Sequence, residues 1–382
     1  MTGAFAAILL LLSAAPAAMP EEVTVRVLGR HHPQLLRLSR PGESHVASVE
    51  GGRLLLDGRP VEGTRVFPAS LWRLSVRGAP PREYQGSVSL AVDRDELAIG
   101  VRMAIEDHVA SVVAAETEGG TPMEALKALA VVARSYAASA RGRHADADLC
   151  DLAHCQVLGT EAPGAHRASA RAAARATRGE VLRLPDGAIA AAPFHAACGG
   201  HTADPREVFG GEGTGAAAVP DPTCPAAPWR TTVPARLFAR VASRELAAAG
   251  SSREVPVASE LRFQRGQGGV VVRVTDGEAS VGGEAFTRAL DRALGHGKVR
   301  SARFGISGGG EDLLLSGSGI GHGVGLCQAG SIRRAGAGEG YERILRHYFP
   351  GARLAAPSPI AGRLLAEPTA PPSAPLSRTS SR

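Results

Sequence analysis

The stretch Thr121–Ala140, TPMEALKALAVVARSYAASA, contains the clearest helix signal in the chain. Thr121 is expected at the N-cap, Pro122 suits the first helical position, and Glu124 stands where a capping box places its acid. Apolar side chains recur at helical spacing; they are Ala125, Leu126, Leu129, Val132, Ala133 and Tyr136. We therefore expect a long amphipathic helix that starts at about Pro122.

The segments on both sides of this helix predict an α+β fold of mixed strands and helices. Short apolar runs separated by turns predict a strand-rich region before residue 85. Strands and then a helical stretch follow up to Glu116. Further helices are expected over 166–180, 233–250 and 282–295, with a strand over 269–276.

The N-terminus, MTGAFAAILLLLSAAPAAMPEE, has the pattern of a secretory signal peptide. An apolar run over Ala4–Leu12 precedes small residues that favour cleavage near Ala15–Ala18. A membrane anchor is the alternative, although the run is shorter than the roughly 20 residues that span a bilayer. We expect an exported protein of the periplasm, cell wall or extracellular space, with no transmembrane span after signal cleavage.

The composition indicates which classes of partner to expect and how the chain divides into segments. The 382 residues are 44% hydrophobic, enough for a substantial core, and the net charge of +6 favours polyanionic partners weakly. No basic run with interleaved aromatic residues is present, so we expect no nucleic acid as a partner. The expected order is signal peptide, β-rich region, main domain and disordered Pro/Ser/Ala-rich tail, over 1–19, 20–84, 85–354 and 355–382.

The densest group of metal-binding residue types lies in HADADLCDLAHC, which begins at His144. His144, Cys150, His154 and Cys155 supply two imidazoles and two thiols, a donor set that suits tetrahedral Zn²⁺. The alternative is a disulfide between Cys150 and Cys155 with two exposed histidines. The spacing leaves both open.

Glu116, in VVAAETEGG, is a candidate general acid because it ends an apolar stretch just before the predicted helix. Partial burial there would raise the pKa of its carboxyl and keep it protonated for proton donation. Glu118 is a rival two residues away. The plainer alternative is a solvated loop glutamate.

The segment FHAACGGHT places His195, Cys198 and His201 around a Gly199–Gly200 turn. A catalytic Cys/His pair is one interpretation. A structural turn is the other, with Cys198 in a disulfide, for example to Cys224.

The glycine-rich stretch Ser316–Gly330, SGSGIGHGVGLCQAG, lacks the glycine phasing and the Gly-Lys-Ser/Thr ending of nucleotide-binding loops. Its alternating glycines instead indicate a backbone that approaches another group closely. His322 and Gln328 are the polar groups that such a backbone would present.

Four ordered motifs resemble the stage II sporulation protein D (SpoIID) family, which includes the amidase enhancers. They are VVAAE with PMEALKALAVVARSYA, LCDLAHCQVLG, FHAACGGHTADPREVFGG and GHGVGLCQAGSIRRAGAGEGYERILRHYFPG. Together they cover about residues 85–352. After Glu116 the chain reads ETEGGTP, where the family has Glu-Met-Pro.

The resemblance implies lytic transglycosylase activity on peptidoglycan glycan strands, with Glu116 rather than Glu118 as general acid and then base. Cleavage between N-acetylmuramic acid and N-acetylglucosamine would leave a 1,6-anhydro end. The alternative function is a non-catalytic enhancer of an N-acetylmuramoyl-L-alanine amidase. A cysteine peptidase that uses Cys198 or Cys327 is a third hypothesis.

The resemblance also implies structural zinc, bound by a set that matches the family's two histidines and two cysteines: His144, Cys150, His154 and Cys155. The residues that we expect to bind substrate are Arg134, Tyr136, His195, Gly199, Gly200, His322 and Gln328.

Overall fold

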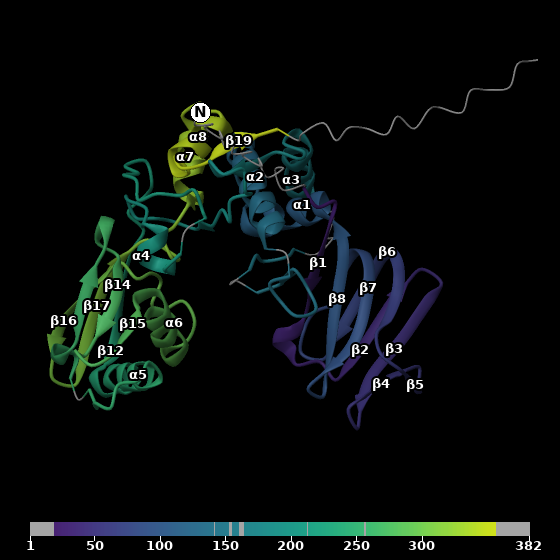
Figure 1. Cartoon of the computed structure of the whole chain (residues 1–382), viewed down its shortest axis with the longest axis horizontal. Helices are drawn as coiled ribbons and strands as arrows, with labels where there is room; N and C mark the ends of the chain where they lie inside the picture. The colour runs from purple at the N-terminus through teal and green to yellow at the C-terminus, as the bar shows by residue number, and fades with distance from the viewer. Residues whose placement is uncertain are drawn as a thin grey trace, which may run out of the picture.

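The computed structural model describes residues 19–140, 142–152, 155–159, 164–211, 213–255 and 257–356. The expected signal peptide, apart from its last residue, and nearly all of the expected tail lie outside these ranges. The described residues confirm an α+β fold and include no helix that is both long and apolar enough to cross a membrane. A large sheet, a group of helices and a second α/β lobe make up the chain (Figure 1).

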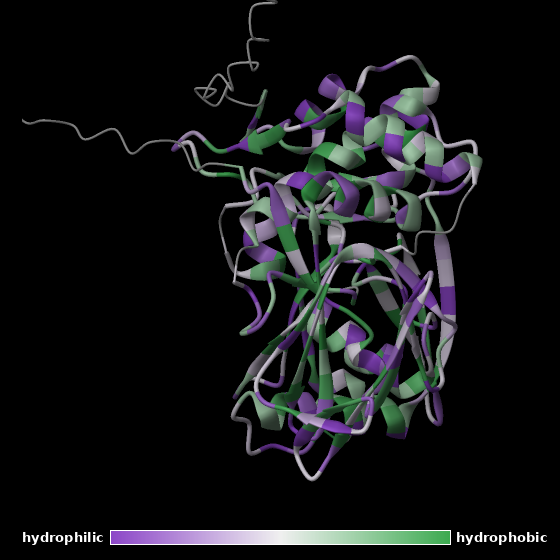
Figure 2. Cartoon of the chain, turned by 90° about the vertical axis from the view of Figure 1, so that its right-hand side faces the viewer, coloured by the Kyte–Doolittle hydropathy of each residue, from purple (hydrophilic) through white to green (hydrophobic). Residues whose placement is uncertain are grey.

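The N-terminal part is a nine-stranded sheet in the order β5-β4-β3-β2-β6-β7-β8-β1-β9. Buried residues alternate with partly or fully exposed ones along β7, as expected for a sheet with one face toward a core. Figure 2 shows hydrophobic and hydrophilic residues interspersed along the strands. The strands are β1 (Glu22–Arg26), β2 (Leu35–Arg40), β3 (Glu43–Glu50), β4 (Arg53–Leu56), β5 (Arg59–Val61), β6 (Arg65–Val76), β7 (Arg82–Asp93), β8 (Glu96–Ala104) and β9 (Leu149–Cys150).

The expected domain boundary between residues 84 and 85 falls inside strand β7. Strands β7 and β8 continue the sheet in antiparallel register, for example Val88 opposite Val101. Strand β8 then passes directly into helix α1, which begins at Ile105. The strand-rich region therefore extends to Ala104 and shares one core with the helices that follow.

The helices beside this sheet hold the predicted long helix at their centre. Helix α2 is confirmed over Met123–Ser139 and packs against α1, α3, α7 and α8. Its expected cap is wrong: Pro122 is the N-cap, and the Thr121 hydroxyl donates instead to the Glu118 carbonyl. The helices are α1 (Ile105–Glu116), α2 (Met123–Ser139), α3 (Ala165–Ala176), α7 (Gln328–Gly336) and α8 (Tyr341–Tyr348).

The second lobe is an α/β unit with its own hydrophobic core, built around Phe238 and Phe286. Two three-stranded sheets, β12-β17-β16 and β13-β14-β15, pack with helices α5 and α6. Its elements are β12 (Pro228–Pro234), α5 (Ala235–Ala248), β13 (Arg262–Arg265), β14 (Val271–Thr275), β15 (Ser280–Gly282), α6 (Gly283–Leu294), β16 (Phe304–Gly309) and β17 (Asp312–Ser318).

Short elements lie between the nine-stranded sheet, the helices beside it and the second lobe. Strand β11 pairs in parallel with β18, and β10 pairs with the last strand, β19. They are β10 (Val181–Arg183), β11 (Phe194–His195), α4 (Pro205–Phe209), β18 (Leu326–Cys327) and β19 (Arg353–Ala355), with 3₁₀ turns at Gly29–His31, Ala258–Glu260 and Gln267–Gly269.

Candidate active site

Glu116 is the last residue of helix α1, and the chain turns to an extended conformation at Thr117. Burial raises the pKa of the Glu116 carboxyl above its ordinary value, while hydrogen bonds from Gln328 and the Val157 backbone offset part of the shift. The partial negative charge at a helix C-terminus disfavours a carboxylate there as well. The position therefore favours the protonated form that a general acid needs. Glu118, by contrast, is exposed.

Gln328 comes to Glu116 from the far end of the chain. Its side-chain amide donates a hydrogen bond to the Glu116 backbone carbonyl at 3.1 Å. Gln328 is the first residue of α7, and that helix packs against α2. The first and the last of the four motifs thus meet at the candidate acid.

The FHAACGG and GHGVGLCQ segments are bound to each other by backbone hydrogen bonds. Strands β11 and β18 pair with His195 opposite Cys327, and Ala197 and Ile320 exchange N–H···O bonds at 3.1 and 2.7 Å. Gly325 has φ +76° and lies so close to Pro193 that a Cβ would meet the proline carbonyl oxygen at 2.2 Å. This confirms the expectation that the glycine-rich backbone approaches another group closely. At Gly325 that group is the Pro193 backbone of the same chain.

Two histidines, His195 and His322, lie beside each other where these segments meet, with ring centroids 5.6 Å apart. Burial lowers the pKa of His195 to about 4, and burial together with His195 lowers that of His322 to about 3. His195 Nδ1 donates to the Val324 carbonyl, whereas Nε2 is buried without a hydrogen-bond partner among the described residues. Both rings are therefore neutral at physiological pH.

Arg134 does not lie where a substrate could touch it. The side chain is 0% exposed and makes a bidentate ion pair with Glu106, at 2.9 and 2.7 Å. Its remaining N–H groups donate to the carbonyls of Glu180 and Ala174 and to the Thr177 hydroxyl. The expectation of substrate contact is corrected: Arg134 ties α2 to α1 and α3, because a buried guanidinium needs all of these partners.

Tyr136, Gly199 and Gly200 contact groups other than Glu116. The Tyr136 hydroxyl accepts a hydrogen bond from Arg143, whose guanidinium also lies over its ring. Gly199 and Gly200 have φ of +69° and +106° and form the turn after Cys198. Their backbone N–H groups hydrogen-bond the sulfur of Cys224.

The predicted zinc ligands His144, Cys150 and Cys155 converge, with donor atoms within 4.8 Å of one another. His144 Nε2 and Cys150 Sγ each lie 3.3 Å from Cys155 Sγ. Zn–S and Zn–N bonds of about 2.3 and 2.1 Å give tetrahedral edges of roughly 3.6–3.8 Å, so these residues fit the ion. The fourth expected ligand, His154, lies outside the described residues.

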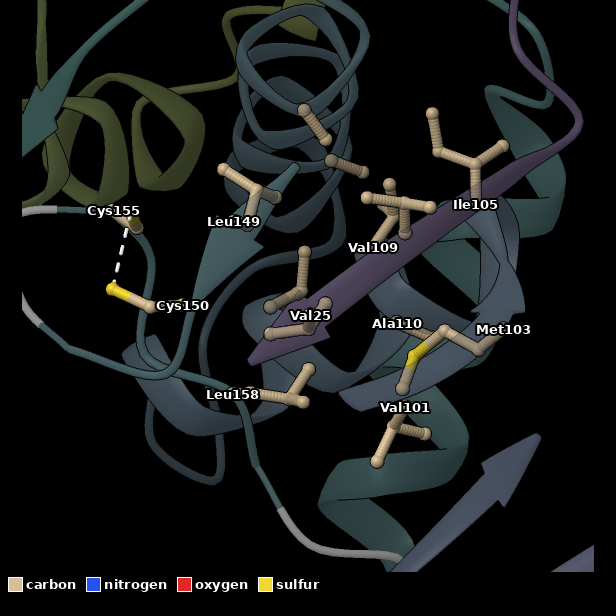
Figure 3. Packing of buried hydrophobic residues seen from close by; sticks show 14 of the residues in the cluster. Val25, Val101, Met103, Ile105, Val109, Ala110, Leu149, Cys150, Cys155 and Leu158 are labelled. Carbon is tan, nitrogen blue, oxygen red and sulfur yellow. Dashed lines mark hydrogen bonds between the residues drawn. The ribbon is translucent and has the colours of Figure 1, made fainter. Parts of the chain in front are cut away.

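Cys150 lies on strand β9, and Cys155 lies opposite it (Figure 3). Leu149 lies toward Val25 of β1, which pairs with it in parallel, and the two sulfurs face each other at the edge of the hydrophobic cluster. The Asp151 carboxylate accepts the Leu28 N–H at 2.9 Å and anchors the following turn.

The segment after Cys155 connects this cluster to the candidate acid. Gln156 accepts a hydrogen bond from His108 of α1 at 2.9 Å and donates to the Ala133 carbonyl of α2. Two residues after Cys155, the Val157 N–H reaches the Glu116 carboxyl. The position of Cys155 therefore affects the position of the Val157 N–H, which hydrogen-bonds the Glu116 carboxyl.

Cys198 and Cys327 do not have the setting of catalytic nucleophiles. Both are buried, and hydrogen bonding with Cys224 together with burial raises the pKa of Cys198 to about 12. A reactive cysteine needs an accessible thiolate at neutral pH. Cys150 Sγ and Cys155 Sγ lie 3.3 Å apart, farther than the roughly 2.05 Å of a disulfide bond. No disulfide joins Cys198 to Cys224 in this structure.

Comparison with known proteins identifies the central part of the chain. Residues 93–184, which contain Glu116 and the His144–Cys155 cluster, match the family model described as SpoIID, stage II sporulation protein. An uncharacterized protein of Brachyspira hyodysenteriae is 28% identical over 277 residues, 71% of this chain and 72% of that protein. A protein of Bacillus subtilis (strain 168) named amidase enhancer is 50% identical over 40 residues, 10% of this chain and 6% of its own length.

Proposed function

Because this chain belongs to the SpoIID and amidase enhancer family, we propose that it is an exported peptidoglycan lytic transglycosylase. Its substrate is the glycan strand, cleaved between N-acetylmuramic acid and N-acetylglucosamine. The observation that carries the proposal is the raised pKa of Glu116, a partly buried carboxyl that Gln328 and Val157 hold at the end of α1.

One carboxyl is sufficient for this reaction. Protonated Glu116 gives its proton to the glycosidic oxygen as the bond from C1 of N-acetylmuramic acid to that oxygen breaks. The resulting carboxylate takes the proton of the sugar's own C6 hydroxyl, and O6 bonds to C1 to close the 1,6-anhydro ring. Glu116 ends protonated as it began, and no water is consumed. A hydrolase of the usual type needs a second carboxylate to activate water.

Zinc has a structural part in this proposal. His144, Cys150, His154 and Cys155 would hold it, and four protein ligands leave no position open for a substrate. When bound, the ion would hold Cys150 next to Cys155. Through the two residues that follow, it fixes the Val157 N–H at Glu116.

Two variants test the assignment of the acid. Purified peptidoglycan stripped of its stem peptides is incubated with wild type, Glu116→Gln and Glu118→Gln, and soluble fragments are separated by liquid chromatography. Wild type and Glu118→Gln should release fragments at equal rates, since Glu118 is exposed. Glu116→Gln should release none above background, and release by that variant would reject Glu116 as the acid.

A non-catalytic role as an amidase enhancer is the second candidate, supported by the local identity to the protein of that name. It predicts that wild type and Glu116→Gln stimulate a purified N-acetylmuramoyl-L-alanine amidase equally on intact peptidoglycan. Under the transglycosylase proposal, stimulation requires Glu116. Stimulation by both proteins without any glycan cleavage would favour the enhancer function.

A further inference from the structure

Three cysteines and one aspartate from separate segments converge outside the predicted zinc cluster. The sulfurs of Cys198, Cys224 and Cys327 and a carboxylate oxygen of Asp221 lie within 4.8 Å of one another. All four residues are buried. We propose that they form a second metal site, which binds Zn²⁺ through three thiolates and one carboxylate oxygen.

The spacing of these atoms fits one tetrahedral ion. Cys327 Sγ lies 3.5 Å from Cys224 Sγ, and Cys198 Sγ lies 3.5 Å from Asp221 Oδ2. Zn–S bonds of about 2.3 Å and Zn–O bonds of about 2.0 Å give tetrahedral edges of roughly 3.8 Å between sulfurs and 3.5 Å from sulfur to oxygen. The observed pairs are close to these edges.

Backbone N–H groups surround the sulfurs in the manner of a thiolate site. The N–H groups of Cys198 and Gly330 each donate to Cys327 Sγ at 3.3 Å. Those of Gly199 and Gly200 hydrogen-bond Cys224. N–H donors stabilise an anionic sulfur, and such outer-shell bonds orient metal ligands. The positive φ angles of the two glycines therefore have a role at this cluster.

The charge of the filled site is balanced by two partly buried cations, Arg303 and Arg334. Three thiolates and one carboxylate around Zn²⁺ carry a net charge of −2. Arg334 lies 3.5 Å from Asp221 Oδ1, and the Arg303 guanidinium lies near Cys198 and Cys224. An anionic buried centre next to two arginines is far less costly than an isolated one.

Asp221 is oriented as a ligand, with one oxygen directed at the thiols. Oδ2 accepts the Tyr348 hydroxyl at 2.6 Å and faces Cys198, while Oδ1 accepts the Thr223 hydroxyl at 2.7 Å. Gly330 allows this approach, because a Cβ there would lie 2.1 Å from Asp221 Oδ2. The Asp221 carboxylate is 0% exposed, and Arg334 pairs with its Oδ1. Oδ2 is the oxygen that a cation among the thiols would use.

A disulfide would use these groups less completely than a metal. It would join two sulfurs, leave the third thiol buried, and give the Asp221 oxygen no cation among the thiols. A metal uses all four groups at once and releases three thiol protons on binding. It would also fasten Cys327, the residue directly before Gln328, to the two segments that carry Cys198 and Cys224.

Metal counting on the full chain tests the proposal. Protein purified with Zn²⁺ in the buffer is desalted and examined by elemental analysis and native mass spectrometry. We expect two zinc ions per wild-type chain, one in Cys224→Ser, and one in Cys150→Ser/Cys155→Ser, which serves as the reciprocal control. A wild-type content unchanged by Cys224→Ser would overturn the second site. So would a disulfide between any two of Cys198, Cys224 and Cys327 in non-reducing peptide maps.

A spectroscopic measurement covers the case in which Cys224→Ser does not fold. Co²⁺ replaces zinc in the Cys150→Ser/Cys155→Ser variant, which keeps the proposed site intact. We expect strong near-ultraviolet thiolate-to-cobalt absorption and, with zinc instead, an X-ray absorption spectrum of three sulfurs and one oxygen. A spectrum with only oxygen and nitrogen ligands would refute the site. Neither readout depends on glycan cleavage.

Discussion

The side-chain amide of Gln328 donates a hydrogen bond to the backbone carbonyl of Glu116, at 3.1 Å and across 212 residues of sequence. This bond joins the end of α1 to the start of α7. Gln328 also hydrogen-bonds the Glu116 carboxyl, which opposes the rise in its pKa due to burial. The C-terminal motif therefore controls both the position and the acidity of the proposed acid.

Gln328→Ala should change the pH dependence of glycan cleavage as well as its rate. Without the amide, the pKa of Glu116 should rise further, so the protonated acid should persist to higher pH. The limb where activity falls with rising pH should move upward, while loss of positioning lowers the maximal rate roughly 10–100-fold.

The pH–rate profile of fragment release measures both effects. Gln85→Ala, at an exposed position of β7, is the matched control and should leave the profile unchanged. A slower Gln328→Ala enzyme with an unshifted profile would show that Gln328 does not act on the Glu116 carboxyl.

Glu116→Gln should stabilise the fold at neutral pH. A carboxyl whose pKa is raised in the folded state binds its proton more tightly there than in the unfolded chain. The free energy of unfolding then falls as pH rises from the ordinary value of 4.5 through the raised value, and the loss is complete above it. Glutamine does not ionise, so the free energy of unfolding of Glu116→Gln does not fall in this way as pH rises.

Urea unfolding of both proteins at pH 7 and at pH 4 measures this difference. The variant should be the more stable at pH 7, and the gap should shrink at pH 4, where the wild-type carboxyl is protonated. A wild type that is the more stable protein at pH 7 would contradict the raised pKa.

Periodicity predicted the helices well because burial of an apolar face decides where they form. Helix α2 and the helix over Ala235–Ala248 lie where their apolar spacing indicated. The Thr121 cap failed because residue 122 takes the cap position and the Thr121 hydroxyl turns back to Glu118. Residue 84 lies inside strand β7, because strand pairing across a turn continues the sheet, and composition does not reveal pairing.

The sequence indicated candidate residues for the site one at a time, but it did not indicate their arrangement. The position of Glu116 before a capped helix indicated an acid, whereas its contact with Gln328 depends on tertiary packing. The helix pattern did not reveal that Arg134 is buried, because the pattern places this residue among the polar positions. The grouping of Cys198, Cys224 and Cys327 was missed because each cysteine lies in a different segment.

Arg134→Met should strongly destabilise the protein. The change leaves Glu106 without its ion pair and removes the Arg134 donors from the carbonyls of Glu180 and Ala174. Removing one partner of such a buried pair costs about 3–5 kcal/mol. Arg240→Met, at an exposed position of α5, should change the free energy of unfolding by less than about 0.5 kcal/mol.

Denaturant titration of the two arginine variants gives these values directly. Equal stability of Arg134→Met and Arg240→Met would mean that the Arg134–Glu106 pair does not hold the helices together. Substrate contact by Arg134 would then need to be considered again.

Gly325→Ala should destabilise the pairing of β11 with β18. Alanine is strained at φ +76°, and its Cβ would lie 2.2 Å from the Pro193 carbonyl oxygen. We expect a loss of more than about 1 kcal/mol in the free energy of unfolding. Gly305→Ala has open space and no positive φ, so it is the matched control and should be nearly neutral. Thermal unfolding of both variants compares them, and a harmless Gly325→Ala would refute the close approach.

Product analysis in H₂¹⁸O tests the central claim, that Glu116 directs attack by the sugar's own C6 hydroxyl. Denuded glycan strands are digested with wild type in labelled water, and the fragments are weighed by mass spectrometry. The account predicts 1,6-anhydro ends that are one water lighter than reducing ends and contain no ¹⁸O, and it predicts none of these fragments from Glu116→Gln. Reducing ends that carry one ¹⁸O, or the absence of any cleavage by wild type, would contradict it.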